Sequence, residues 1–229
     1  EEFERALGHR EERSMLRKLL TRISKIRVFD PACGSGSFLY EALRTLRRLE
    51  FKGHLRVIGR DISPAAISMA RFVLALAESD WRPSGGIEVD LRVADFLTDD
   101  RTQADVILMN PPFLSWTAMS TTQREQVREL MGPMLKGRAD LSMVFVSRAL
   151  NCLRPGGSLG ILIPSTLLTL LSAERWRDAI ARDADIRLVA SLGDFGLFRH
   201  AMVQVAAMVL SLKDGALQRP HSALAIIAS

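Results

Sequence analysis

IRVFDPACGSGSFLYEALRTLRRLE, residues 26–50, is the stretch of sequence that decides the fold. Residues 26–30 are short, apolar and β-branched, which is typical of a buried strand, and a Gly/Ser turn follows at once. Residues 38–50 then place apolar side chains at helical spacing. The stretch therefore predicts a strand, a tight turn and a helix.

The same alternation continues along the chain. Periodicity predicts strands at 26–30, 55–61, 87–95, 104–110, 158–164, 186–192 and 203–212, and helices at 12–24, 38–50, 64–81, 139–153 and 173–184. Pro155, Gly156 and Gly157 form a stop signal between a helix and the next strand. The loop between the last two strands is too short for a crossover helix, so these strands are expected to form an antiparallel hairpin.

This order of elements predicts an α/β fold of the Rossmann-like type. We expect a mostly parallel seven-stranded sheet with an antiparallel edge hairpin and helices on both faces. No repeat, low-complexity tract or linker divides the chain. We therefore expect an N-terminal helical segment at 1–25 and one domain at 26–229, and a hydrophobic content of 48% is enough for one substantial core.

Composition narrows the class of protein. Lys and Arg number 31 against 26 Asp and Glu, and this net charge of +5 suits a polyanionic partner such as nucleic acid. The two cysteines, Cys33 and Cys152, are not closely paired, which favours a reducing compartment. The sequence shows no signal peptide or membrane-spanning run, and its histidines lack metal-ligand spacing. We expect a cytoplasmic protein with no membrane-spanning segment and no metal site.

Ligands of open α/β sheets bind beyond the carboxyl ends of the strands, so the residues just after each strand are candidates for function. Asp30 ends the first strand and can pair with a cationic amine, while Gly34 and Gly36 let the backbone turn tightly and approach a ligand. A dinucleotide fingerprint would need a third glycine where Leu39 stands, and the Gly-Lys-Ser/Thr sequence of a P-loop is absent. A plain strand-to-helix turn remains the alternative interpretation.

Acidic residues also end the next two strands. Asp61 can accept hydrogen bonds from both hydroxyls of a ribose, or else belong to a helix N-cap region. Asp95 can accept from an adenine amine while Phe96 covers the adenine face. A nucleoside that carries a charged amino acid instead of a pyrophosphate matches this set, which predicts S-adenosylmethionine as the cofactor. Its expected contacts are Asp30, Pro31, Ala32, Cys33, Gly34, Ser35, Gly36, Phe38, Asp61, Ile62, Asp95, Phe96 and Asn110.

The strand at 104–110 ends in Asn110-Pro111-Pro112-Phe113. Asn-Pro alone is a common turn initiator. The two prolines remove two backbone donors, so the Asn110 side-chain carbonyl and the Pro111 backbone carbonyl can accept both hydrogens of a planar amine. This acceptance exposes the lone pair of the amine nitrogen, and Phe113 can stack on an extruded base. These four residues are the candidate catalytic group.

Together these motifs resemble those of the gamma-class amino-methyltransferases that modify adenine in DNA, including enzymes of restriction-modification and phage defence. The resemblance covers residues 26–212 and rests on DPACGSGSFL, GRDISPAA, ADF, NPPF, ADLSMVFVSRALNCLRPGGSLGILIPSTLL and GDFGLFRHAMVQVAAMVLSL. It implies a catalytic domain at 26–229 that methylates the exocyclic amine of adenine in double-stranded DNA, with the target adenine flipped out. The family residues corresponding to Asp30, Gly34, Gly36, Asp61 and Asp95 bind the cofactor, and those corresponding to Asn110–Phe113 are catalytic.

The sequence departs from the family pattern in two places, and both bear on whether this chain contains the whole enzyme. The family often carries a tyrosine-containing cofactor motif before the Gly-rich turn, whereas the only aromatic residue in 1–25 is Phe3. Its target-recognition domain normally follows the catalytic domain, and none is apparent before Ser229. We therefore expect a fragment, with a target-recognition or nuclease domain as a separate or missing partner.

Residues 116–138 are polar, Met-rich and basic at their end. We hypothesise a mobile loop over the target base that brings Trp116, Lys136 and Arg138 near nucleic acid; a solvated helix and loop is the alternative.

Other functions also stay open. The substrate could instead be an RNA adenine or a protein glutamine amide, or the chain could be a binding module for S-adenosylmethionine without catalysis. A nicotinamide dehydrogenase is disfavoured by the missing third glycine.

Overall fold

The computed structural model describes residues 14–16, 23–98, 102–192, 204–213 and 224–228. The chain divides into two compact units, residues 1–94 (unit 1) and residues 95–229 (unit 2). Residues 14–16 are helical, while Ile23 and Ser24 are not, so the predicted first helix ends before its expected end at residue 24. The other residues of this prediction, 12, 13 and 17–22, lie outside the described residues.

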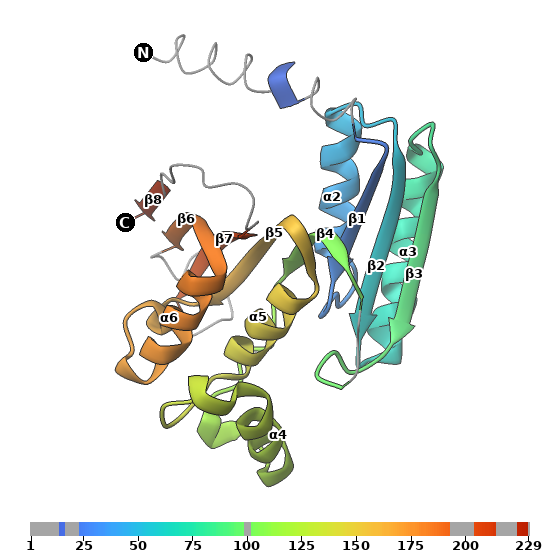
Figure 1. Cartoon of the computed structure of the whole chain (residues 1–229). Coiled ribbons are helices and arrows are strands. Elements are labelled where there is room, and N and C mark those ends of the chain that lie inside the picture. The colour runs from blue at the N-terminus through green and yellow to red at the C-terminus, as the bar shows by residue number, and fades with distance from the viewer. Residues whose placement is uncertain (1–13, 17–22, 99–101, 193–203, 214–223, 229) are drawn as a thin grey trace. The chain divides into compact units, whose positions relative to one another are not determined.

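Unit 1 contains a parallel sheet of three strands in the order β3-β2-β1 (Figure 1). Helix α2 packs on β1, and α3 packs on β2 and β3. Ser63 caps α3 by accepting a hydrogen bond from the Ala66 amide, and Pro64 opens the helix, as expected of a first turn. The elements are β1 (Lys25–Asp30), α2 (Ser37–Arg48), β2 (His54–Asp61), α3 (Pro64–Asp80) and β3 (Ile87–Val93).

Unit 2 contains a mixed sheet in the order β4-β5-β7-β6-β8. Strands β4 and β5 are parallel, β7 runs antiparallel to both β5 and β6, and β8 is parallel to β6. The antiparallel pair predicted near the end of the chain is therefore confirmed, and β8 is an additional strand. The elements of the sheet are β4 (Ala104–Met109), β5 (Leu153–Pro164), β6 (Ala184–Leu192), β7 (Val205–Leu212) and β8 (Leu224–Ala228).

The helices of unit 2 include one that periodicity did not predict. α4 (Thr121–Met131) begins at a capping box, in which Ser120 and Gln123 satisfy each other's backbone amides. α5 (Leu141–Asn151) and α6 (Glu174–Asp183) match the predicted helices, and the Trp176 indole of α6 donates a hydrogen bond to the Met143 carbonyl of α5. Short 3₁₀ helices fill the connections at Trp116–Ala118, Gly132–Met134, Ser165–Leu168 and Leu171–Ala173.

Strand β5 differs from its prediction at its beginning. It starts at Leu153, five residues before the predicted position, and includes Pro155, Gly156 and Gly157. The partner of Ala104 is Leu153, whereas the partner of Val106 is Ser158, so the extra residues of β5 form a bulge. The predicted stop signal therefore does not end the helix: α5 already ends at Asn151, and Pro155, Gly156 and Gly157 lie within β5.

No helix among the described residues is long and apolar enough to cross a membrane. Most of the loop predicted between the last two strands lies outside the described residues, which resume at residue 204.

Candidate functional site

The turn after β1 has a conformation that favours glycine at two positions. Gly34 and Gly36 have φ angles of +52° and +86°, in the left-handed region. A Cβ at Gly36 would lie 3.2 Å from the Ala70 Cβ, so this glycine also allows the start of α2 to approach α3. A Cβ at Gly34 would meet nothing within 4 Å, which means that open space lies beside the turn there.

Asp61 joins this turn to the end of β2. Its Oδ2 accepts a hydrogen bond of 2.8 Å from the Gly34 amide, and its Oδ1 accepts one of 2.9 Å from the Ser63 amide at the start of α3. A backbone hydrogen bond of 2.9 Å, from the Cys33 amide to the Arg60 carbonyl, also joins the turn to β2. The structure thus brings the predicted Gly-rich turn and the predicted ribose acceptor together. Each carboxylate oxygen has a second lone pair, so Asp61 can still accept from a ligand.

Asp30 is the buried member of this group, with 1% of its surface exposed. Its Oδ1 accepts from the Ala32 amide at 3.0 Å, and no cationic side chain pairs with it within the described part of the chain. Burial, together with the negative charge of Asp61, raises the pKa of Asp30 to about 8 against the opposing effect of the Ala32 amide. A cation bound here would favour the ionised form.

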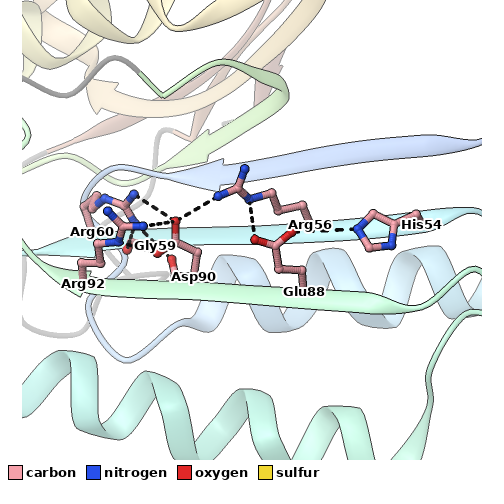
Figure 2. A network of polar contacts seen from close by, with 7 residues as sticks. All are labelled: His54, Arg56, Gly59, Arg60, Glu88, Asp90 and Arg92. Atoms are coloured by element: carbon pink, nitrogen blue, oxygen red, sulfur yellow. Dashed lines mark hydrogen bonds and ion pairs between the residues drawn. The ribbon is translucent and has the colours of Figure 1, made fainter.

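A network of charged side chains supports the ends of β2 and β3, and Figure 2 shows how its members face one another. The Asp90 carboxylate lies 3.4 Å from the Arg60 guanidinium and 2.7 Å from that of Arg92. Arg60 also donates to the carbonyls of Gly59 and Asp90. Burial alone would raise the pKa of Asp90, but Arg60 and Arg92 outweigh it and lower the pKa. Because Arg60 precedes Asp61 directly, this network holds the segment that carries Asp61.

Sequence reasoning did not select Arg60 or Asp90. The available signal was an arginine directly after the apolar run Val57–Gly59 of a predicted strand, since a buried arginine needs a partner. Among the predicted contacts of unit 1, Ile62 is 72% exposed beside Asp61 and presents an apolar surface to solvent. Pro31, Cys33 and Gly36 are buried, whereas Ala32, Ser35 and Phe38 are half-buried.

Asp95 and Phe96 begin unit 2. The exposed Asp95 uses Oδ1 to accept from the Leu97 amide at 2.9 Å. Phe96 is 1% exposed, with its ring 5.5 Å from that of Phe145 and the Arg148 guanidinium 5.5 Å from its centroid. The predicted cover for adenine therefore also packs within unit 2, against α5.

The tetrapeptide Asn110–Phe113 directly follows β4. Asn110 and Pro112 are exposed, Phe113 is half-buried and Pro111 is buried. Among the residues that the structure describes, none forms a hydrogen bond with the Asn110 side chain, so its carbonyl is available to a substrate. Leu114, next along the chain, accepts from the Leu141 amide at 2.9 Å, which ties the segment to the start of α5.

The predicted site residues therefore form two groups, one in each unit. Asp30, the Gly-rich turn and Asp61 belong to unit 1, and Asp95, Phe96 and Asn110–Phe113 belong to unit 2. Within the described residues, no group of three or more His, Cys, Asp and Glu side chains could hold a metal ion.

Comparison with known proteins identifies the family. The family model described as N-6 DNA Methylase matches residues 11–226, which include both groups of site residues. The chain belongs to the N-6 DNA Methylase family.

Two relatives within this family span most of the chain. The type II methyltransferase M.BanIII of Aneurinibacillus aneurinilyticus is 30% identical over 79% of this chain and 32% of its own length. The type II methyltransferase M.TthHB8I of Thermus thermophilus is 30% identical over 82% of this chain and 40% of its own length. The chain thus spans between 32% and 40% of the length of these relatives.

A solved structure confirms the predicted fold class. It is that of a Listeria monocytogenes protein assigned to the class I S-adenosylmethionine-dependent methyltransferases, and it matches with a TM-score of 0.73 at 19% identity. The match covers 94% of this chain and 62% of the other. This N-6 DNA Methylase family member therefore has the class I methyltransferase fold.

Proposed function

We propose that this protein transfers the methyl group of S-adenosylmethionine to the exocyclic amine of adenine in DNA, as part of a restriction-modification or related defence system. The observation that carries the proposal is the N-6 DNA Methylase match over residues 11–226, with Asn110–Phe113 directly after β4. In this proposal residues 26–229 are the catalytic domain, residues 1–25 are a helical segment, and a target-recognition or nuclease domain acts as a separate partner.

The residues of unit 1 fit the proposed cofactor. Asp30 is a buried carboxylate without a cationic partner in the described part of the chain, and it would hold the positively charged amino acid moiety. Gly34 leaves open space at the turn, and the remaining lone pairs of Asp61 would accept the ribose hydroxyls. No side chain caps the start of α2, so its first amides would face the cofactor carboxylate. When bound, S-adenosylmethionine supplies an electrophilic methyl group on a sulfonium.

Asn110 and Pro111 would prepare the amine for methylation. The side-chain carbonyl of Asn110 and the backbone carbonyl of Pro111 accept the two amine hydrogens, which draws the nitrogen lone pair out of conjugation with the ring. Alignment and hydrogen bonding supply the catalysis, so no strong general base is needed. Asp95, whose Oδ1 accepts from the Leu97 amide, would use its remaining lone pairs to accept from the adenine amine of the cofactor.

Phe113 would stack on the target adenine after the base leaves the duplex. Stacking of a base on an aromatic ring contributes on the order of 1–3 kcal/mol, which offsets part of the energy needed to flip a nucleotide. Phe113 is half-buried, so part of its side chain remains accessible to a base, which supports this role.

A transfer assay with radiolabelled cofactor tests the proposal. The protein is incubated with DNA, RNA or a protein extract, and the label in each macromolecule is counted. We expect label in DNA, and we expect Asn110→Ala to abolish it while cofactor binding measured by calorimetry changes less than about threefold. Exclusive labelling of RNA or protein would contradict the substrate, and full turnover by Asn110→Ala would contradict the role of Asn110.

A further inference from the structure

A recess in unit 2 lies beside the segment that follows Phe113. It has a volume of about 300 Å³, at the lower end of the range for small-ligand pockets. Three segments line it: residues 115–117, residues 138–140 and the stretch from Pro164, the last residue of β5, to Ser172. A β-bridge between Ser115 and Asp140 joins the first two segments.

Trp116 supplies an aromatic ring that is fixed in place. The Arg128 guanidinium lies 5.0 Å from the centroid of this half-buried ring, and the Arg124 guanidinium lies 6.0 Å from it. Arg124 also donates a hydrogen bond of 2.9 Å to the Trp116 carbonyl and one of 3.1 Å to that of Thr117. Both arginines belong to α4, which does not line the pocket, and together they fix the position of the ring. Trp116 is therefore a preformed surface on which a base could stack.

Asp140 and Arg138 give the pocket one acceptor and one cation. Asp140 Oδ1 accepts from both the amide and the hydroxyl of Ser142, at 2.9 and 2.6 Å, whereas Oδ2 has no partner in the described part of the chain. Arg138 is exposed and makes no ion pair within the same residues. By contrast, Lys136 is engaged with Glu174 at 2.9 Å.

We propose that this pocket binds one nucleotide of the DNA strand, next to the nucleotide whose base reaches Asn110–Phe113. This inference rests on the proposed function. A nucleotide matches the three features: its phosphate suits Arg138, its flat base suits Trp116, and an N–H on its base edge suits Asp140 Oδ2. Pro164, Leu167 and Leu170 add an apolar surface against which the base can pack. Asp140 thereby becomes a residue that discriminates between flanking bases.

Binding measurements test the pocket independently of methyl transfer. We expect Trp116→Ala to weaken affinity for a fluorescent duplex about tenfold, and Arg138→Ala to lower the salt slope of binding by about 1. Arg154→Ala is the matched control, because Arg154 is an exposed arginine at the opposite end of β5 and lines no part of the pocket. Thermal melts verify that each variant is folded. Quenching of tryptophan fluorescence by an oligonucleotide should be lost in Trp116→Phe.

Asp140→Asn tests discrimination between bases. Asparagine keeps the cap of α5, because its side-chain oxygen can still accept from Ser142, but it replaces the free acceptor with an amide donor. Methylation of duplexes with each of the four bases beside the target adenine should therefore show a changed order of base preference, because the base that donates to Asp140 Oδ2 in the wild type meets an amide donor in the variant. If the wild type methylates DNA but Trp116→Ala, Arg138→Ala and Asp140→Asn all leave DNA affinity and base preference unchanged, the pocket is overturned and the proposed function still stands. Failure of the wild type to methylate DNA would instead refute the proposed function.

Discussion

The Gly34 amide donates a 2.8 Å hydrogen bond to the Asp61 carboxylate, across 27 positions of sequence. The second oxygen of the same carboxylate accepts from the Ser63 amide. One side chain therefore fixes the Gly-rich turn after β1 and the start of α3, and the geometry of the proposed cofactor site depends on it.

Replacement of Asp61 by alanine should affect both stability and binding. Two amides lose their acceptor, so the free energy of unfolding should fall by about 1–2 kcal/mol. Affinity for S-adenosylmethionine should fall more than about tenfold, because the ribose acceptor is lost as well. Denaturant titration and calorimetry measure the two effects. Asp61→Asn retains one acceptor oxygen and should lie between wild type and alanine; equal cofactor affinity in all three proteins would contradict the account.

Asp30 should make stability depend on pH. Its pKa rises from 3.8 in the unfolded chain to about 8 in the folded protein. The folded state therefore binds one more proton between these values, and the contribution of Asp30 to stability, complete below about pH 4, is lost as the pH rises toward 8. Asp30→Asn should flatten this part of the stability profile in denaturant melts. A parallel decline in the variant would assign the pH dependence to another group.

Cofactor binding should release a proton from Asp30. At pH 7 the carboxyl group is mostly protonated, and the cationic cofactor favours its ionised form. Calorimetry in buffers of different ionisation enthalpy counts the protons released. We expect close to one for the wild type at pH 7 and none for Asp30→Asn, together with weaker binding by the variant. Absence of proton release in the wild type would indicate that the cation binds elsewhere.

The two glycines of the turn should respond differently to alanine. Gly34→Ala should cost about 1 kcal/mol of stability, which reflects its left-handed backbone alone, but should strongly weaken cofactor binding because the methyl group enters the open space. Gly36→Ala should cost about 2 kcal/mol or more, since its methyl group also crowds Ala70. Denaturant titration of both variants with a binding measurement on Gly34→Ala provides the comparison, and wild-type cofactor affinity in Gly34→Ala would be the contrary result.

The charged network of Arg60, Asp90 and Arg92 should contribute to stability mainly through its buried members. Asp90→Ala removes the carboxylate that faces the buried Arg60 and should cost on the order of 3 kcal/mol. Arg92→Ala removes a guanidinium that is 65% exposed and should cost less than about 1 kcal/mol. Urea titration distinguishes the two, and equal losses would indicate that burial of Arg60 does not govern the network.

Strands β1 to β7 and most of the described helices were predictable because their apolar periodicity is strong, whereas β8 was not predicted. β1, β2 and α3 lie within one or two residues of their predicted bounds, since Asp30, Asp61 and Pro64 mark their ends in the sequence. α4 lies within residues 116–138, where a mobile loop was the hypothesis and a solvated helix and loop the alternative. Its sequence is polar, and only two of its side chains, Val127 and Met131, are buried. Its signal was the capping box formed by Ser120 and Gln123.

The candidate site was predictable as a set of residue types and less so as a set of contacts. The sequence placed Asp61 at a strand end, but the hydrogen bond to Gly34 depends on how two turns meet in space. Similarly, Trp116 and Asp140 are 24 positions apart, and only the bridge between Ser115 and Asp140 makes them neighbours in one pocket. Side-chain partners of this kind are set by tertiary packing, which local patterns do not encode.

The most direct test of the central claim is nucleoside analysis of DNA after incubation with the protein and isotopically labelled S-adenosylmethionine. The DNA is digested to nucleosides and the products are separated and weighed by mass spectrometry. We predict labelled N6-methyl-deoxyadenosine with the wild type and none with Asn110→Ala. Label in a methylated cytosine alone, or equal adenine methylation by Asn110→Ala, would contradict the account.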